Sequence, residues 1–151
     1  MSTHAADLVV RKSLTVAAPL ERAFEVFTER IGTWWPFETF SIGEGRTRGA
    51  VFEGHEGGDV YELIGDERAS WATVLAWEPP TRVVLSWHVN PEVPATELEI
   101  RFAPEAEGTL VVLEHRGWER FGDRAADASG GYAQGWDLVL GHYAEGADTD
   151  G

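Results

Sequence analysis

A segment near the C-terminal end of the chain carries a stripe of large apolar side chains at helical spacing. Its members, at successive offsets of 4, 7, 8 and 11 residues from the first, are Tyr132, Trp136, Val139, Leu140 and Tyr143. This spacing gathers side chains on one side of a helix, and an aromatic stripe of this kind needs another surface to pack against. The sequence therefore predicts a long helix, from about Asp123 to Glu145, that lies against the rest of the domain.

Most of the preceding residues alternate between apolar and polar side chains, which is typical of half-buried strands. The first such segment is Leu8–Val16, and the others are residues 49–53, 59–64, 68–78, 81–90, 96–103 and 109–117. Short connections rich in glycine or proline predict hairpins and hence an antiparallel sheet. Between the first two strands, Pro19–Thr28 has helical spacing, and a second short helical turn must end before Pro36. This order predicts an α+β domain, with six strands in a meander between the short helices and the long one.

The length of 151 residues fits one domain, 1–151, with a core at about residues 8–146 and tails at 1–7 and 147–151. A domain of this size buries about 68–70% of the surface that its unfolded chain exposes. The absence of cysteine excludes disulfides, thiolate catalysis and cysteine-rich zinc sites, and is compatible with the reducing cytoplasm, where we expect the protein. No targeting pattern and no apolar run of about 18 residues is present, so we expect no membrane insertion.

The charge balance argues against two classes of partner. Twelve basic and 26 acidic residues give a net charge of −14, which opposes approach to the phosphates of nucleic acid and to anionic lipid. We therefore predict no nucleic-acid partner. The excess of acid can serve solubility alone, and binding to a basic partner is the alternative. A homodimer or another protein partner is left open by the sequence.

The sequence holds no assembled catalytic motif. It lacks a Gly-x-Ser-x-Gly elbow, a phosphate loop and a dinucleotide fingerprint, so we expect no cofactor. The five histidines are scattered without the spacing of metal ligands, so no metal is expected. Two nearby acids can separate their pKa values for acid–base chemistry, but Glu62, Glu97 and Glu99 fall in the polar phase of their strands. We predict that these three carboxylates lie on a solvated outer face.

Three parts of the chain resemble a known family. They are Pro19–Trp35, the strand that ends in Leu113–Trp118, and above all Gly135–Leu140, whose sequence is Gly-Trp-Asp-Leu-Val-Leu. The chain resembles the activator-of-Hsp90-ATPase-like branch of the START-like (SRPBCC) superfamily over roughly Leu8 to Tyr143. The resemblance implies a helix-grip fold, in which a curved antiparallel sheet wraps around the C-terminal helix and encloses a cavity. Many relatives bind small apolar or amphipathic molecules there, others are polyketide cyclases, and the branch is named after a co-chaperone module.

The side chains expected to line such a cavity are those in the inward phase of the strands and of the terminal helix. From the strands these are Trp71, Leu75, Trp77, Leu85 and Trp87, from the helix Tyr132, Trp136 and Leu140, and near the mouth Trp35 and Phe37. The chain contains seven tryptophans, more than a core of this size needs. The alternative is that these aromatic side chains simply fill the core.

Two residues with titratable side chains are candidates for the same cavity. His115 shares the inward phase of its strand with Val111 and Leu113, and a histidine there could orient a ligand or act as a base near neutral pH. The alternative is a histidine of the core or rim whose hydrogen bonds are satisfied within the protein. Glu53 follows Phe52 and could also point inward. Three hypotheses follow: a protein that binds small apolar or amphipathic molecules, a cyclase or hydrolase with His115 or Glu53 as its proton shuttle, and a co-chaperone-like interaction module.

Overall fold

Seven strands make up one antiparallel sheet in the computed structural model, which describes residues 8–37, 39–40, 43–89 and 93–149. They are β1 (Val10–Val16), β2 (Thr47–Phe52), β3 (Asp59–Ile64), β4 (Glu67–Glu78), β5 (Arg82–Trp87), β6 (Thr96–Glu105) and β7 (Gly108–Arg116). Their order in the sheet is β1-β7-β6-β5-β4-β3-β2, so β2 to β7 form the predicted meander and β1 pairs with β7. The predicted tail at residues 1–7 and the predicted strand end at Asn90 lie outside the described residues.

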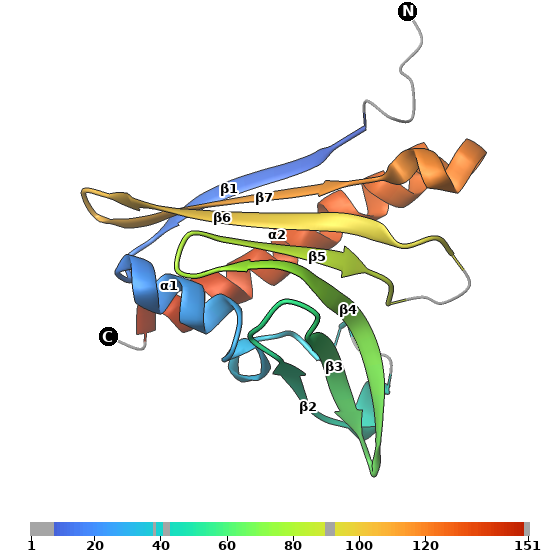
Figure 1. The fold of residues 1–151 in the computed structure, drawn as a ribbon, viewed down its shortest axis with the longest axis horizontal. Coiled ribbons are helices and arrows are strands. Elements are labelled where there is room, and N and C mark those ends of the chain that lie inside the picture. The colour runs from blue at the N-terminus through green and yellow to red at the C-terminus, as the bar shows by residue number, and fades with distance from the viewer. Residues whose placement is uncertain (1–7, 38, 41–42, 90–92, 150–151) are drawn as a thin grey trace, which may run out of the picture.

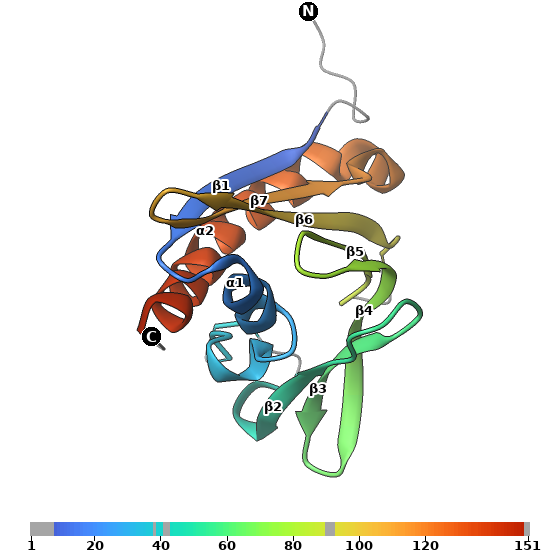
Figure 2. The same ribbon diagram turned by 60° about the vertical axis from the view of Figure 1, so that its left-hand side comes forward.

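The sheet curves around the C-terminal helix, as Figures 1 and 2 show. Helix α2 (Ala125–Thr149) crosses the concave face behind β1, β7 and β6, and α1 (Leu20–Phe27) packs beside it. The connecting segments include short 3₁₀ turns at Ile31–Thr33, Glu44–Arg46 and Trp118–Arg124. The predicted α+β class and the helix-grip arrangement are confirmed. Across the described ranges, no helix is both long enough and apolar enough to cross a membrane.

Helix α2 extends beyond its predicted end near Glu145 to Thr149. Ala147 is buried, and Oδ1 of Asp148 accepts a hydrogen bond from the backbone N–H of Ala17 at 2.8 Å. Residues 147–149 therefore belong to the folded domain and tie the end of α2 to the segment that follows β1.

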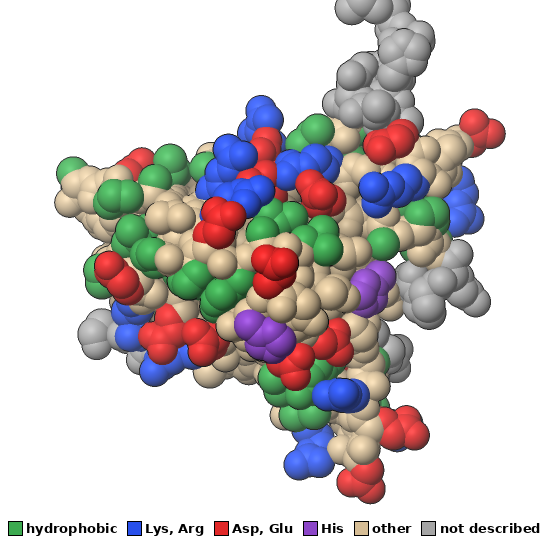
Figure 3. Space-filling model, in the orientation of Figure 1, with side chains coloured by type: hydrophobic (Ala, Val, Ile, Leu, Met, Phe, Trp, Pro, Cys, Tyr) green, Lys and Arg blue, Asp and Glu red, His purple; other side chains and the backbone are tan. Residues whose placement is uncertain are grey.

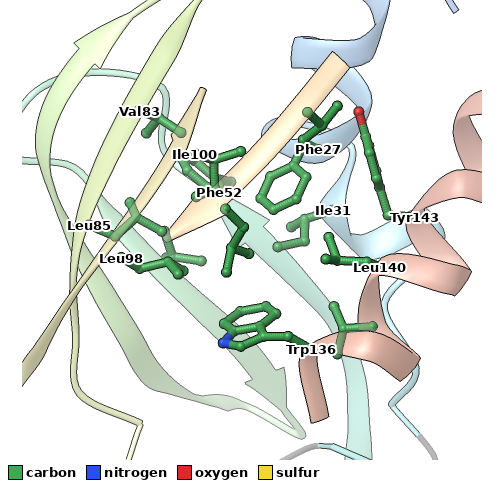
Figure 4. Packing of buried hydrophobic residues seen from close by; sticks show 14 of the residues in the cluster. Phe27, Ile31, Phe52, Val83, Leu85, Leu98, Ile100, Trp136, Leu140 and Tyr143 are labelled. Atoms are coloured by element: carbon green, nitrogen blue, oxygen red, sulfur yellow. The ribbon is translucent and has the colours of Figure 1, made fainter. Parts of the chain in front are cut away.

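The core fills the space between the concave face of the sheet and the helices. Figure 4 shows side chains of β5 and β6 pointing toward those of α1 and α2. On the helix side, Tyr143 is fully buried, its ring lies 5.0 Å from that of Phe27, and its hydroxyl donates to the backbone oxygen of Ala23 at 2.8 Å. The C-terminal part of the predicted stripe on α2 therefore belongs to the core. The part nearer the N-terminal end of the helix is available to line the site.

Strand β4 departs from simple alternation at two β-bulges. Its pairing with β3 shifts so that Trp71 is extra, and its pairing with β5 shifts so that Leu75 is extra. An extra residue reverses the inward and outward phases that follow it. Trp71 and Val74 therefore point inward, whereas the side chain of Leu75 is 46% exposed. The predicted inward placement of Leu75 is wrong for this reason.

The convex face of the sheet carries paired charges of both signs over β1, β7 and β6 (Figure 3). Glu99 is only 2% exposed, because its carboxylate is bonded by Nε of Arg82 at 2.6 Å, by Nε of Arg101 at 2.9 Å and by Arg116. The prediction of a solvated Glu99 is wrong: it points outward as expected, but the arginines cover it. Burial raises the pKa of Glu99, and the hydrogen bonds and charges of the arginines outweigh burial and lower it.

Candidate functional site

A cavity of about 470 Å³ lies between the first half of α2 and the sheet. Its aromatic walls include Trp35, Trp71, Trp87, Tyr132 and Trp136. The sequence predicts the last four in the chamber and Trp35 near its mouth. The other lining residues are Thr39, Phe40, Glu62, Val89, Asp127, Ala128, Gly131, Gly135 and Val139. Cavities of this volume with mostly apolar walls are typical sites for small organic molecules.

The tryptophans of the wall hold one another in place. The rings of Trp35 and Trp71 have centroids 4.7 Å apart, and those of Trp87 and Trp136 are 5.5 Å apart. The Trp35 indole N–H also donates to the backbone oxygen of Phe40 at 2.6 Å. Tilted aromatic pairs at such distances are attractive beyond their apolar burial. The walls therefore present fixed aromatic surfaces to the cavity.

Tyr132 places a hydroxyl group in this aromatic wall. Its oxygen accepts a hydrogen bond from the Trp87 indole N–H at 3.1 Å, which joins α2 to β5 across the cavity. Burial raises the pKa of Tyr132, and the hydrogen bond from Trp87 offsets only part of this effect. Tyr132 is consequently a neutral phenol at neutral pH.

His115 lies on the inward face of β7 but behind the cavity wall. It is fully buried, its Nδ1 accepts the Trp136 indole N–H at 3.0 Å, and its Nε2 lies 2.6 Å from Oγ1 of Thr96. Because an indole N–H can only donate, Nδ1 carries no proton and the N–H is on Nε2. Burial lowers the pKa of His115 to about 3. At neutral pH it is an uncharged support for Trp136, with both ring nitrogens engaged.

Glu62 is a cavity residue that the sequence reasoning missed. We predicted a solvated outer position, but the side chain is fully buried on the inward face of β3, in phase with Val60. One carboxylate oxygen accepts the backbone N–H of Gly43 at 2.8 Å and the hydroxyl of Thr47 at 2.7 Å. The other accepts the Trp71 indole N–H at 2.8 Å. The sequence indicates this inward position only through the strand phase that Glu62 shares with Val60.

The small residues on α2 leave the cavity open toward its mouth. Gly131 and Gly135 precede Trp136 on the same helical stripe as Ala128, and all of them line the cavity. A Cβ atom added at Gly131 would meet nothing within 4 Å, whereas at Gly135 it would lie 3.4 Å from the Phe40 ring.

The remaining predicted residues lie outside the lining. Leu85 and Leu140 are buried in the core, and Phe37 packs behind the wall with its ring 6.4 Å from that of Trp71. Trp77 packs against Phe24, with ring centroids 5.1 Å apart, away from the cavity.

Glu53 and Leu75 are also separate from the cavity. Glu53 lies just beyond the end of β2 and accepts the backbone N–H of Asp59 at 2.8 Å, which closes the turn into β3. Leu75 is exposed at its bulge. Of the two residues proposed as proton shuttles, Glu53 thus stabilises a turn and His115 holds Trp136 in position.

The fold and the cavity define a helix-grip protein, and comparisons with known proteins agree. The sequence profile of the family described as "Activator of Hsp90 ATPase homolog 1-like protein" matches residues 17–144. The chain belongs to this family. A search of curated proteins gave no match.

Solved structures of similar proteins cover most of the chain. A protein from Nitrosomonas europaea is 18% identical, with a TM-score of 0.68 over 93% of this chain and 94% of its own, and shows the shared fold. An anthrahydroquino-γ-pyrone synthase is 36% identical, with a TM-score of 0.57 over 83% of this chain and 86% of its own. CalU16 from Micromonospora echinospora is 25% identical, with a TM-score of 0.57 over 90% of this chain and 70% of its own.

Proposed function

We propose that this protein binds a small planar aromatic molecule in the cavity between α2 and the sheet. The observation that carries the proposal is a cavity of about 470 Å³ walled by four tryptophans and Tyr132. Flat aromatic walls favour flat aromatic ligands, because stacked and edge-to-face contacts add to apolar burial, which contributes about 25 cal/mol per Å².

The comparisons support the same class of ligand. The 36% identical relative is a synthase whose name denotes a fused aromatic hydroquinone that carries a pyrone ring. A fused ring system of this kind is flat and largely apolar, as the cavity walls of this chain require. Among the lining residues that the structure describes, the ionisable groups other than Tyr132 are the carboxyl groups of Glu62 and Asp127, so we expect neutral ligands to be preferred over anionic ones.

Titration with anthraquinone, a neutral planar probe, tests the proposal. We expect saturable quenching of tryptophan fluorescence, because the probe would contact several of the wall tryptophans. The free energy of unfolding should rise as well, by about 2.7 kcal/mol when the free probe is at 100 times its Kd. Anthraquinone-2-sulfonate, of similar shape but anionic, is the matched control and should bind more weakly. If no planar aromatic probe quenches or stabilises the protein, the proposal is refuted.

A second candidate is an enzyme that closes a ring in a bound polyketide-type substrate. The similarity to the synthase favours it, because that relative covers most of this chain. Such a reaction needs a proton-handling group at the cavity wall, and Tyr132 and Glu62 are the interior groups with exchangeable protons or acceptor oxygens. Mass-spectrometric product analysis with linear aromatic polyketide substrates would test it. Equal product distributions with and without the protein would refute it.

A further inference from the structure

We propose that the Tyr132 hydroxyl is the hydrogen-bond donor that recognises an acceptor oxygen, a ketone or quinone carbonyl, on the ligand. This inference rests on the proposed function and adds the polar group that the ligand must carry. It follows from the hydrogen bonds among the described residues of the cavity wall, in which the O–H of Tyr132 is an interior side-chain donor without an acceptor.

The indole N–H groups of all four wall tryptophans are already used within the protein. Trp35 donates to the backbone oxygen of Phe40, Trp71 to Glu62, Trp87 to Tyr132 and Trp136 to His115. An indole has a single N–H and accepts no hydrogen bond. The tryptophans therefore offer a ligand only their ring surfaces.

Tyr132 differs because its oxygen is engaged only as an acceptor. Trp87 donates to this oxygen at 3.1 Å, and a phenol that accepts one bond still has its own O–H to donate. Among the described residues, no acceptor receives that O–H. Its ring packs against two neighbouring rings, those of His115, at a centroid distance of 4.9 Å, and Trp118, at 5.3 Å. The donor is consequently held at a defined place in the wall.

The other polar side chains among the described lining residues do not offer an interior donor. Glu62 lines the cavity but is fully buried, and both of its carboxylate oxygens already act as acceptors, for Gly43, Thr47 and Trp71. Asp127 and Thr39 are exposed and lie toward the mouth of the cavity.

The bond from Trp87 also makes Tyr132 a better donor. Hydrogen bonds in a chain polarise one another, so donation into the phenol oxygen strengthens the bond that its O–H makes next. Burial raises the pKa of Tyr132, which keeps the O–H protonated at neutral pH. A carbonyl oxygen, which only accepts, fits this donor better than a ligand hydroxyl that must also place its own proton.

Fluorenone and fluorene form the probe pair that tests the inference, because they share one flat ring system and differ by a carbonyl oxygen. After correction for their different partition into an apolar solvent, the wild-type protein should bind fluorenone about 3- to 10-fold more tightly than fluorene. This ratio is what one net hydrogen bond implies. The Tyr132→Phe variant keeps the ring and should lose this preference. Tyr143→Phe removes a hydroxyl bonded to Ala23 outside the cavity and should retain it.

The infrared carbonyl stretch of bound fluorenone gives an independent readout. It should move to lower frequency in the wild-type protein than in an apolar solvent, and move back in Tyr132→Phe. If circular dichroism shows that Tyr132→Phe does not fold, the shift of the carbonyl stretch in the wild-type protein alone tests the inference. Binding of both probes without a preference or a shift overturns this inference and leaves the proposed function standing. Binding of neither probe overturns both.

Discussion

The Trp136 indole N–H donates to Nδ1 of His115 at 3.0 Å, and this bond fixes the charge of the histidine. A protonated Nδ1 would direct a second N–H at the indole N–H, so the bond exists only with neutral His115. Trp136 is in turn a wall of the cavity. The shape of the site therefore depends on a histidine that does not itself line it.

The neutral state of His115 predicts a specific loss of stability in acid. Its pKa is about 3 in the folded protein, against 6.5 for a free histidine. Between these values the unfolded chain binds a proton that the folded protein does not, so the free energy of unfolding falls as the pH drops from 6.5 toward 3. The slope from this residue is at most about 1.4 kcal/mol per pH unit.

Urea unfolding across this pH range measures the effect, with His115→Gln for comparison. Glutamine offers Trp136 an acceptor and Thr96 a donor but does not titrate, so the variant should lose less stability per pH unit. Carboxylates titrate in both proteins and cancel in the difference. Parallel curves for the two proteins would contradict a buried neutral histidine.

Glu62 predicts a second stability effect, because Gly43, Thr47 and Trp71 all donate hydrogen bonds to it. Glu62→Gln would turn an amide NH₂ toward the N–H of Trp71 or toward the donors at Gly43 and Thr47. We expect a loss of about 1–3 kcal/mol in the free energy of unfolding, the cost of a mismatched buried polar group. Glu67→Gln, at the exposed start of β4, is the control and should change stability by less than about 0.5 kcal/mol. Equal stabilities for the two variants would argue against this role.

Alternation predicted the fold well where the strands are regular and failed where they are not. Strand β5 pairs with β6 without a register shift, and its predicted inward residues Leu85 and Trp87 are buried. The bulges of β4 arise at Trp71 and Leu75, where neither glycine nor proline marks them in the sequence. A bulge depends on the pairing partners, so local pattern alone placed Leu75 on the wrong face.

The site was less predictable than the fold because it depends on contacts between distant segments. Glu62 is buried because Gly43, Thr47 and Trp71 bring donors to it from separate parts of the chain. Polarity alone suggests solvent for a carboxylate, and the donors are found only once the chain is folded. By contrast, strand alternation was enough to place Trp87 in the inward set, and helical spacing was enough to place Trp136 there.

The arginine cluster around Glu99 predicts an effect on the other face of the sheet. Glu99→Gln should lower the free energy of unfolding by about 1–2 kcal/mol, because a buried carboxylate is removed from Arg82, Arg101 and Arg116. The loss stays moderate since the arginines are 32–60% exposed and water screens them. The matched variant Glu97→Gln breaks one partly exposed pair, that with Arg116, and should cost less than about 1 kcal/mol.

Acid should weaken the same cluster. The lowered pKa of Glu99 means that its contribution is present at neutral pH and is lost as the pH falls through the pKa of the folded protein. Urea unfolding at neutral and acidic pH checks this, and the difference between wild type and Glu99→Gln should shrink in acid. A difference that grows in acid would show that the arginines do not stabilise the charged form.

Substitutions at two neighbouring glycines of α2 test most directly whether the cavity is the ligand site. Gly131 lines the cavity and Gly130 does not, and an added Cβ would meet nothing within 4 Å at either position. Leucine at either site should leave the helix as stable or raise its stability by up to about 1 kcal/mol. Only Gly131→Leu places its side chain in the cavity.

Tryptophan-quenching titration of anthraquinone into both variants and the wild type is the measurement. We expect Gly130→Leu to bind as the wild type does and Gly131→Leu to bind at least about tenfold more weakly, with a melting temperature no lower than that of the wild type. Wild-type affinity in a fully folded Gly131→Leu protein would contradict the cavity as the place where this protein holds its ligand.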